Sequence, residues 1–204
     1  MLIVTPNKVV VLVLLFSFMY NYSLAQRGNT FFFTTGAGIM SPDKALKHIL
    51  KPGIGFNSGL EFTTTKNWFL QATGDISTFR YDQQVRDNNS TYLFQKSNSP
   101  LLMLGLNGGK NFVFGPNAFA SLYLGEGYLA IGEPRVTLDR TVIRQEIYRH
   151  RSYFIRAGTR IAYTSPIKFL QVLYLDANWW ESGAKLQNHL LGGYSFFIGS
   201  RMGM

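Results

Sequence analysis

The chain has 204 residues, a formal net charge of +9, no cysteine, 15% charged residues and 15% aromatic residues. A typical soluble domain carries about 25% charged residues, so this composition covers a water-facing surface poorly and suits an exterior that faces lipid. The absence of cysteine excludes a disulfide framework, although the N-terminal segment predicts export.

The N-terminal segment, residues 1–25, is a predicted signal peptide. Lys8 supplies a positive start, Val9–Met19 is the apolar core, and Ala25 is the small residue that a signal peptidase requires. A membrane-spanning helix is the alternative interpretation, but such a helix needs roughly 20 apolar residues. We therefore expect cleavage near Ala25 and one mature domain over residues 26–204.

The mature chain is a series of apolar or alternating runs that predict strands. The eight expected strands are residues 30–40, 53–64, 68–81, 94–112, 118–132, 152–164, 168–180 and 189–202. The short connections are 65–67, 113–117 and 165–167, and the longer ones are 41–52, 82–93, 133–151 and 181–188. Outer-membrane barrels have short periplasmic turns and longer outer loops, whereas a soluble β-sandwich has no reason for this asymmetry. The expected fold is therefore all-β: an eight-stranded antiparallel transmembrane β-barrel.

The stretch SYFIRAGTRIAYTSP, residues 152–166, predicts how a strand is oriented in this barrel. As a strand it has an uncharged face that begins and ends with Tyr153 and Tyr163, and an opposite face with Arg156 and Arg160. Arginine facing lipid at mid-depth costs about 2–4 kcal/mol, so both arginines are expected inside the barrel. An unpaired buried charge is costly, so they require partners there.

Alternation in the other strands predicts those partners. The expected interior polar cluster is Glu61, Asp75, Glu126, Asp176, Arg156, Arg160 and Arg201. The strand that contains Glu126 alternates less regularly than the others. An eight-stranded barrel is just wide enough for side chains to fill it, so we expect a filled interior with a structural role. A narrow channel stays open as an alternative.

The eight-strand plan, the signal ending SLAQ (23–26) and the segment LLMLGLNGGKNFVFGPNAFASLYLGEGYLA (101–130) resemble a known group. They are similar to the small outer-membrane β-barrel proteins of Bacteroidota, including the PorT-like group, with an architecture like that of OmpX and OmpA. The resemblance is one of pattern over the whole mature chain, and Met204 departs from the usual aromatic C-terminus. It implies an outer-membrane location and, in some members, a role beside secretion or gliding machinery. It implies no catalytic residues.

The longest predicted outer loop, residues 133–151, is basic. Its cationic side chains are Arg135, Arg140, Arg144, Arg149, His150 and Arg151. The loop is interpreted either as a cationic surface for lipid phosphates, anionic polysaccharide or an acidic protein, or as a solvated hairpin held by its own ion pairs. We expect a non-enzymatic envelope protein or an accessory subunit of a larger outer-membrane complex. Its expected surroundings are outer-membrane lipid and lipopolysaccharide, and no nucleic acid.

His150 and Ser152 are the enzymatic candidate. Their His-x-Ser spacing resembles that of outer-membrane lipid A deacylases, in which the histidine activates a serine nucleophile. The following residues, YFI, differ from that family, no acid is apparent beside the histidine, and both side chains are expected to face inward. We therefore expect no catalytic residue, cofactor or metal site, and a lipid A-modifying hydrolase stays open as the alternative function.

Overall fold

The computed structural model describes residues 29–43, 46–81, 97–139, 142–164, 172–186 and 188–203, and no side chains between 136 and 145. The predicted signal peptide lies outside the described residues. The strands are β1 (Thr30–Pro42), β2 (Leu50–Lys51), β3 (Gly53–Thr63), β4 (Trp68–Tyr81), β5 (Ser97–Val113), β6 (Ala118–Asp139), β7 (Val142–Thr164), β8 (Val172–Leu186) and β9 (His189–Gly203). No helix among the described residues is long and apolar enough to cross a membrane.

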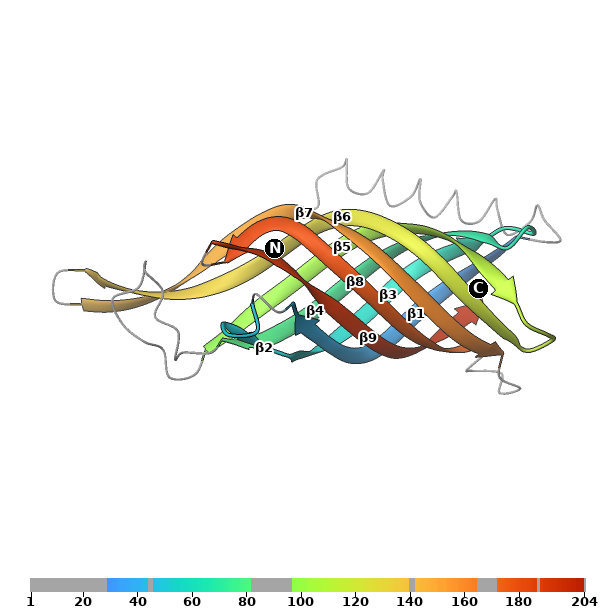
Figure 1. Ribbon diagram of the computed structural model, residues 1–204, viewed down its shortest axis with the longest axis horizontal. Helices are drawn as coiled ribbons and strands as arrows, with labels where there is room; N and C mark the ends of the chain where they lie inside the picture. Colours follow the sequence, from blue (N-terminus) through green and yellow to red (C-terminus); the bar gives the residue numbers. More distant parts are fainter. Residues whose placement is uncertain are drawn as a thin grey trace, which may run out of the picture.

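Eight of these strands close into a barrel. The strand order is β4-β3-β1-β9-β8-β7-β6-β5, and pairing of β4 with β5 joins the two ends. Every neighbouring pair is antiparallel. The two-residue β2 pairs with the end of β4. Figure 1 shows the strands tilted around the long axis of the barrel. The predicted fold class is confirmed.

The strand ends differ from the prediction mainly on the side of the longer loops. Strands β6 and β7 continue to Asp139 and from Val142, so most of the predicted loop 133–151 is a paired hairpin. The predicted long connection 181–188 is wrong, because β8 passes through a bulge and continues to Leu186. Asn188 then adopts a φ of 68°, a left-handed conformation that asparagine tolerates in tight turns.

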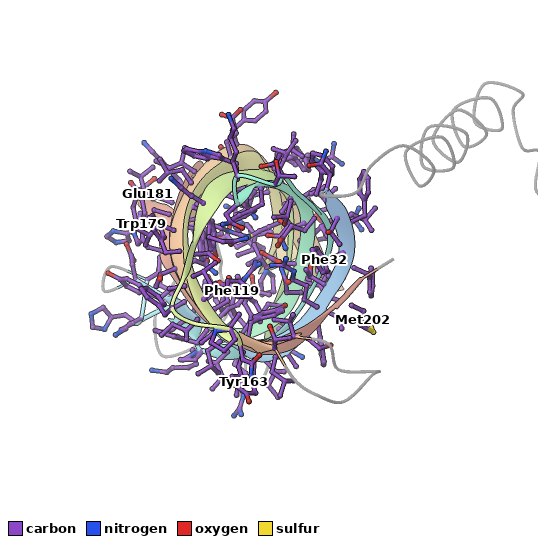
Figure 2. All side chains as sticks on the ribbon, turned by 90° about the vertical axis from the view of Figure 1, so that its right-hand side faces the viewer. Phe32, Phe119, Tyr163, Trp179, Glu181 and Met202 are labelled. Atoms are coloured by element: carbon purple, nitrogen blue, oxygen red, sulfur yellow. The ribbon has the colours of Figure 1, made fainter. Side chains whose placement is uncertain are left out.

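The wall of the barrel has two faces that follow the strand period of two. On β7, Tyr153, Ile155, Ile161 and Tyr163 are exposed, whereas Phe154, Arg156, Arg160 and Ala162 are buried. The other strands also expose large apolar residues, among them Ile54, Leu70, Leu104, Leu124, Leu175 and Phe196. Figure 2 looks along the barrel and shows Tyr163 and Trp179 turned outward and Phe119 turned inward. The exposed apolar belt is the expected lipid-facing surface.

The interior has an apolar part and a polar part. The apolar plug is Met40, Leu46, Ile49, Leu50, Phe79, Tyr81, Leu101, Met103, Leu129, Ile131, Phe154, Trp180, Ala184, Leu186, Leu191 and Phe197. Leu46 and Ile49 come from the connection after β1, where the Asp43 carbonyl accepts hydrogen bonds from the Leu46 and Lys47 amides. Because Leu46 and Ile49 are buried in the apolar plug, this connection packs into the end of the barrel. The polar part consists of the ionic side chains described below.

Ile155 provides a test of the two faces. Replacing Ile155 by Arg puts a charge on the lipid-facing surface, which costs about 2–4 kcal/mol near mid-bilayer, so we expect less folded barrel in the membrane. The folded fraction is measured by heat-modifiability on unboiled gels. Ile155→Leu is the control and should assemble normally. Equal folded fractions for Ile155→Arg and Ile155→Leu would mean that this side chain does not face lipid.

Candidate functional site

Arg160 lies at the centre of the polar interior and connects three strands across the lumen. Its Nε donates to Asp176 at 3.2 Å, its Nη1 to Glu61 at 2.8 Å and its Nη2 to the Gln71 side-chain carbonyl at 3.1 Å. Glu61 has no solvent-exposed surface, and Arg160 is only 3% exposed. One guanidinium therefore holds β7 to β8, β3 and β4 through charge-assisted hydrogen bonds.

Arg156 forms the second ion pair, at the boundary between the polar cluster and the apolar plug. Its Nη2 donates to Asp75, which also accepts a hydrogen bond from the Asn57 amide. The same nitrogen lies 3.9 Å from the Met103 sulfur, and the guanidinium lies 5.2 Å from the centre of the Phe154 ring. Arg156 thus satisfies a buried carboxylate while its planar face packs on the plug.

Arg201 completes the cluster nearer the periplasmic end. Its Nη1 lies 3.0 Å from Oε1 of Glu61, so Glu61 contacts two arginines. The guanidinium lies 3.7 Å from the centre of the Phe32 ring and 5.2 Å from that of Phe119. Figure 2 shows both aromatic side chains turned into the lumen. These rings close the polar cluster on its periplasmic side.

Small residues on the inner wall make room for this cluster. The Tyr123 hydroxyl donates to Asp176 at 2.7 Å. The Tyr123 ring packs over Gly158 on the inner face of the wall. A Cβ atom at Gly158 would lie 2.3 Å from that ring, so a larger residue there would displace Tyr123 from the carboxylate. The interior is therefore fitted to its polar side chains rather than open.

The prediction that Glu126 belongs to the interior is wrong. Its side chain is exposed, and its register partners Leu106 and Ile155 are lipid-facing residues. The inward positions on either side of it are Gly125 and Gly127, whose Cβ atoms would lie 2.0 Å from the Asn107 side chain and 2.1 Å from a backbone oxygen. The lumen has no space for a glutamate here. Without Glu126 the cluster contains three arginines and three carboxylates.

The base of the β6–β7 hairpin contains a second ionic group. Glu133 is fully buried, and its Oε2 accepts a hydrogen bond from Arg135 Nη2 at 2.9 Å and lies 2.6 Å from His150 Nε2. The Arg135 guanidinium lies 4.7 Å from the centre of the Tyr148 ring. The His150 and Tyr148 contacts join β7 to β6 at the base of the hairpin.

A cationic hollow of about 570 Å³ lies beside this base. Its lining is Arg135, Arg149, His150, Arg151, Gly183, Ala184, Lys185 and Asn188. The lining contains no carboxylate, so the hollow suits an anionic group. Of the predicted basic loop residues, Arg140 and the side chain of Arg144 lie outside what the structure describes. The contribution of Lys185 was missed, because the register that brings β8 beside the hairpin is not visible in the sequence.

His150 does have a buried acid beside it, namely Glu133, contrary to our expectation. The ring nitrogen that contacts this acid is Nε2. Ser152 lies two residues before the inward-facing Phe154, on the same face of β7. Its hydroxyl lies close to Gly183, where an added Cβ atom would be 2.9 Å from Oγ. Among the described residues, no hydrogen bond joins His150 to Ser152. His150 therefore contacts Glu133 across the hairpin and does not activate Ser152 as a nucleophile in this geometry.

The described residues contain no group of three His, Asp or Glu side chains that could hold a metal ion. The polar interior also does not converge on a free space, because the carboxylates are occupied by arginine, asparagine, threonine or tyrosine donors. Each carboxylate of the cluster accepts a hydrogen bond from a neighbouring side chain, whereas Nε of Arg156 and Nε of Arg201 are buried without a hydrogen-bond partner in the part of the chain that the structure describes.

The chain matches no protein family model and no curated protein. Among solved structures it is similar to Neisserial surface protein A, with a TM-score of 0.51 and 11% identity over 87% of this chain and 100% of that chain. The match to Ail of Yersinia pestis, in complex with the heparin analogue sucrose octasulfate, has a TM-score of 0.43 and 15% identity over 87% and 100%. The match to the N-terminal β-barrel domain of Pseudomonas aeruginosa OprF has a TM-score of 0.42 and 10% identity over 86% and 100%.

The likeness to Neisserial surface protein A shows that the fold is that of a small outer-membrane barrel. The closed sheet leaves no unpaired edge in the wall, and the outward side chains form an apolar belt. These are the two features that a β-structure needs in order to span a bilayer. The chain is an outer-membrane β-barrel.

Arg156 and Asp75 provide a test of the interior ion pairs. Arg156→Leu leaves a buried carboxylate without its cation, so we expect the free energy of unfolding to fall by about 3–5 kcal/mol. The double variant Arg156→Leu/Asp75→Leu should recover most of this loss, because an apolar pair replaces the ion pair. Urea unfolding in lipid vesicles measures both. A double variant no more stable than Arg156→Leu would assign the loss to packing instead.

Glu126 allows the opposite prediction. Glu126→Leu removes a carboxylate from the lipid-facing wall, so we expect the free energy of unfolding in vesicles to rise by about 1–2 kcal/mol, less than for a lipid-facing cation. Glu146→Leu makes the same change on an exposed residue of the hairpin and should alter stability by less than about 0.5 kcal/mol. A loss of stability in Glu126→Leu would show that the carboxylate has a partner.

Proposed function

We propose that this chain is a non-enzymatic outer-membrane protein that acts through its β6–β7 hairpin as an accessory subunit of a larger envelope assembly. The Bacteroidota barrels that the sequence resembles, including the PorT-like group, suggest secretion or gliding machinery as the assembly. The observation that carries the proposal is the projecting hairpin with its cationic hollow. The partner that suits this surface is a protein with an acidic face.

The length of the hairpin supports a binding role. After the last backbone pair of β6 with β5, Leu101↔Ile131, β6 continues for eight residue pairs with β7 alone, from Gly132↔Arg149 to Asp139↔Val142. At about 3.4 Å per residue, this segment is roughly 25 Å long. Figure 1 shows it projecting from one end of the barrel. An isolated two-stranded hairpin is marginally stable in water and leaves two unpaired edges, so a partner that covers it would stabilise it.

The side chains at the base of the hairpin also favour a protein partner. Ile147 and Tyr148 are exposed beside Arg149 at the point where the hairpin leaves the barrel wall. Aromatic residues and arginine are enriched at the centres of protein interfaces. The adjoining hollow adds the positive charge of Lys185. Electrostatic complementarity would then select an acidic partner.

The interior gives no support for a channel. The polar cluster crosses the lumen through Arg160, and the apolar plug buries residues such as Trp180 and Phe79 completely. Side chains can fill an eight-stranded barrel, and here they meet across it from opposite walls. The proposed activity therefore belongs to the outer surface rather than to the lumen.

The hairpin can be shortened to test the proposal. Residues 136–145 are replaced by Asn-Gly, a favoured two-residue hairpin turn. The variant keeps the residue pair Arg135↔Glu146 at the base of the hairpin and the whole barrel. We expect the variant to fold and to lose its partner in affinity pulldown from mild detergent after cross-linking in the native envelope. Mass spectrometry identifies the proteins that the wild-type chain retains.

Lys185→Glu is the control for charge, because it reverses one cation of the hollow and leaves the hairpin intact. We expect it to weaken capture of the same partner, since an acidic face would meet a carboxylate. Undiminished capture by both variants would contradict the proposal. Loss of acyl chains from lipid A in wild-type cells, but not in Ser152→Ala cells, would instead establish the hydrolase alternative.

A further inference from the structure

A second hollow lies on the lipid-facing side of the wall, below the base of the hairpin. It has a volume of about 790 Å³ and extends over β3, β4, β5, β6 and β7. Its lining is Ile54, Phe56, Ile76, Ser77, Thr78, Pro100, Leu101, Leu102, Tyr128, Ala130, Ile131, Gly132, Ile147, Arg149 and Arg151. From this lining we propose that the hollow binds a phosphorylated multi-acyl glycolipid of the outer leaflet, of the lipid A class.

The apolar part of the hollow is suited to acyl chains. Ile54, Phe56 and Ile76 are each more than half exposed, and Leu102 is 38% exposed. All of them lie in the half of their strands nearer the hairpin, which is on the extracellular side of such a barrel. Five strands spaced about 4.8 Å apart give a surface roughly 20 Å wide. That width is greater than two acyl chains side by side require, so we commit to a lipid with more chains.

The cationic part lies where the lipid headgroup would be. Tyr153 is 82% exposed and pairs with Tyr128, and these two tyrosines mark the outer aromatic girdle. Arg151 and Arg149 lie on the same face of β7 as Tyr153, two and four residues farther toward the tip of the hairpin. The order from membrane to solvent is therefore apolar chains, tyrosine girdle and guanidinium groups.

The two arginines are available for a ligand. Both are exposed, and within the described part of the chain neither has a carboxylate, hydrogen-bond or aromatic partner. The lining of the hollow contains no acidic residue that would repel a phosphate. Guanidinium groups bind phosphate in a bidentate manner, and the low dielectric of the interface strengthens that contact. The complementarity of charge selects a phosphorylated headgroup over a neutral one.

Gly132 shows that the upper edge of this hollow is closely fitted. A Cβ atom at this position would lie 2.8 Å from the Ile147 side chain and 3.0 Å from the Pro100 ring. The Gly132 carbonyl accepts a hydrogen bond from the Ser99 hydroxyl, which fixes β5 against β6 beneath the arginines. The upper edge of the hollow is therefore formed where the base of the hairpin packs against β5.

Native mass spectrometry of the detergent-solubilised full chain tests this site with three probes. They are bisphosphorylated lipid A, its dephosphorylated product and the two-chain lipid phosphatidylglycerol. We expect one lipid A to be retained per barrel. Since each basic residue near a membrane surface contributes about a fivefold factor, Arg149→Gln/Arg151→Gln should weaken lipid A binding roughly 25-fold. Removal of the phosphates should weaken binding to a similar extent.

Lys110→Gln is the matched control. Lys110 lies 5.3 Å from the centre of the Trp68 ring at the periplasmic end. The substitution therefore removes a positive charge from the opposite girdle and should leave lipid A binding unchanged. Equal binding by wild-type and the double arginine variant would overturn the site, and so would equal binding of dephosphorylated lipid A. Phosphatidylglycerol binding as tight as lipid A would overturn the assignment of a multi-acyl ligand. The shortened hairpin keeps both arginines and should bind lipid A normally, which separates this test from the partner test.

Discussion

The constraint on which the rest of this structure depends is the satisfaction of backbone hydrogen bonds in a medium without water. An unpaired amide or carbonyl in hydrocarbon costs several kcal/mol, so a sheet that crosses a bilayer has to close. Pairing of β4 with β5 provides that closure. Once the ring is closed, its register is fixed, and a shift of one residue in any strand would exchange its two faces.

A fixed register with a period of two decides where charge can be placed. Arg156 and Arg160 share one parity on β7 and enter the lumen, where Asp75, Glu61 and Asp176 accept their hydrogen bonds. A buried ion pair gives little net stability, because desolvation offsets much of the attraction. The greater effect of this cluster is on specificity: a strand in the wrong register would bury one of these charges without its partner.

The regular strands could be predicted from the sequence because lipid and lumen impose opposite demands on alternate residues. On β7 the rule holds from Tyr153 to Tyr163 except at Ala157 and Gly158, which are both half-buried. The same rule places Glu126 outside together with Leu122 and Leu124, where the structure has it, so the predicted interior position of Glu126 was the error. Pairings such as Glu133 with His150 could not be predicted, because they depend on how far the hairpin continues before it turns.

The apolar plug shows a different limit of sequence reasoning. Inward-facing residues such as Met103 and Leu129 are apolar, so their strands alternate weakly near the extracellular end. A run that is apolar on both faces predicts a strand but not its orientation.

The apolar plug also affects the charge of the interior. The described lumen combines this uncharged plug with a cluster of three arginines and three carboxylates, so the lumen contributes no net charge. The described residues therefore carry their unbalanced positive charge outside the lumen, and Arg149, Arg151 and Lys185 are among its sources at the extracellular end. Because the interior is neutral, these exposed cations dominate the electrostatic potential of the described extracellular surface.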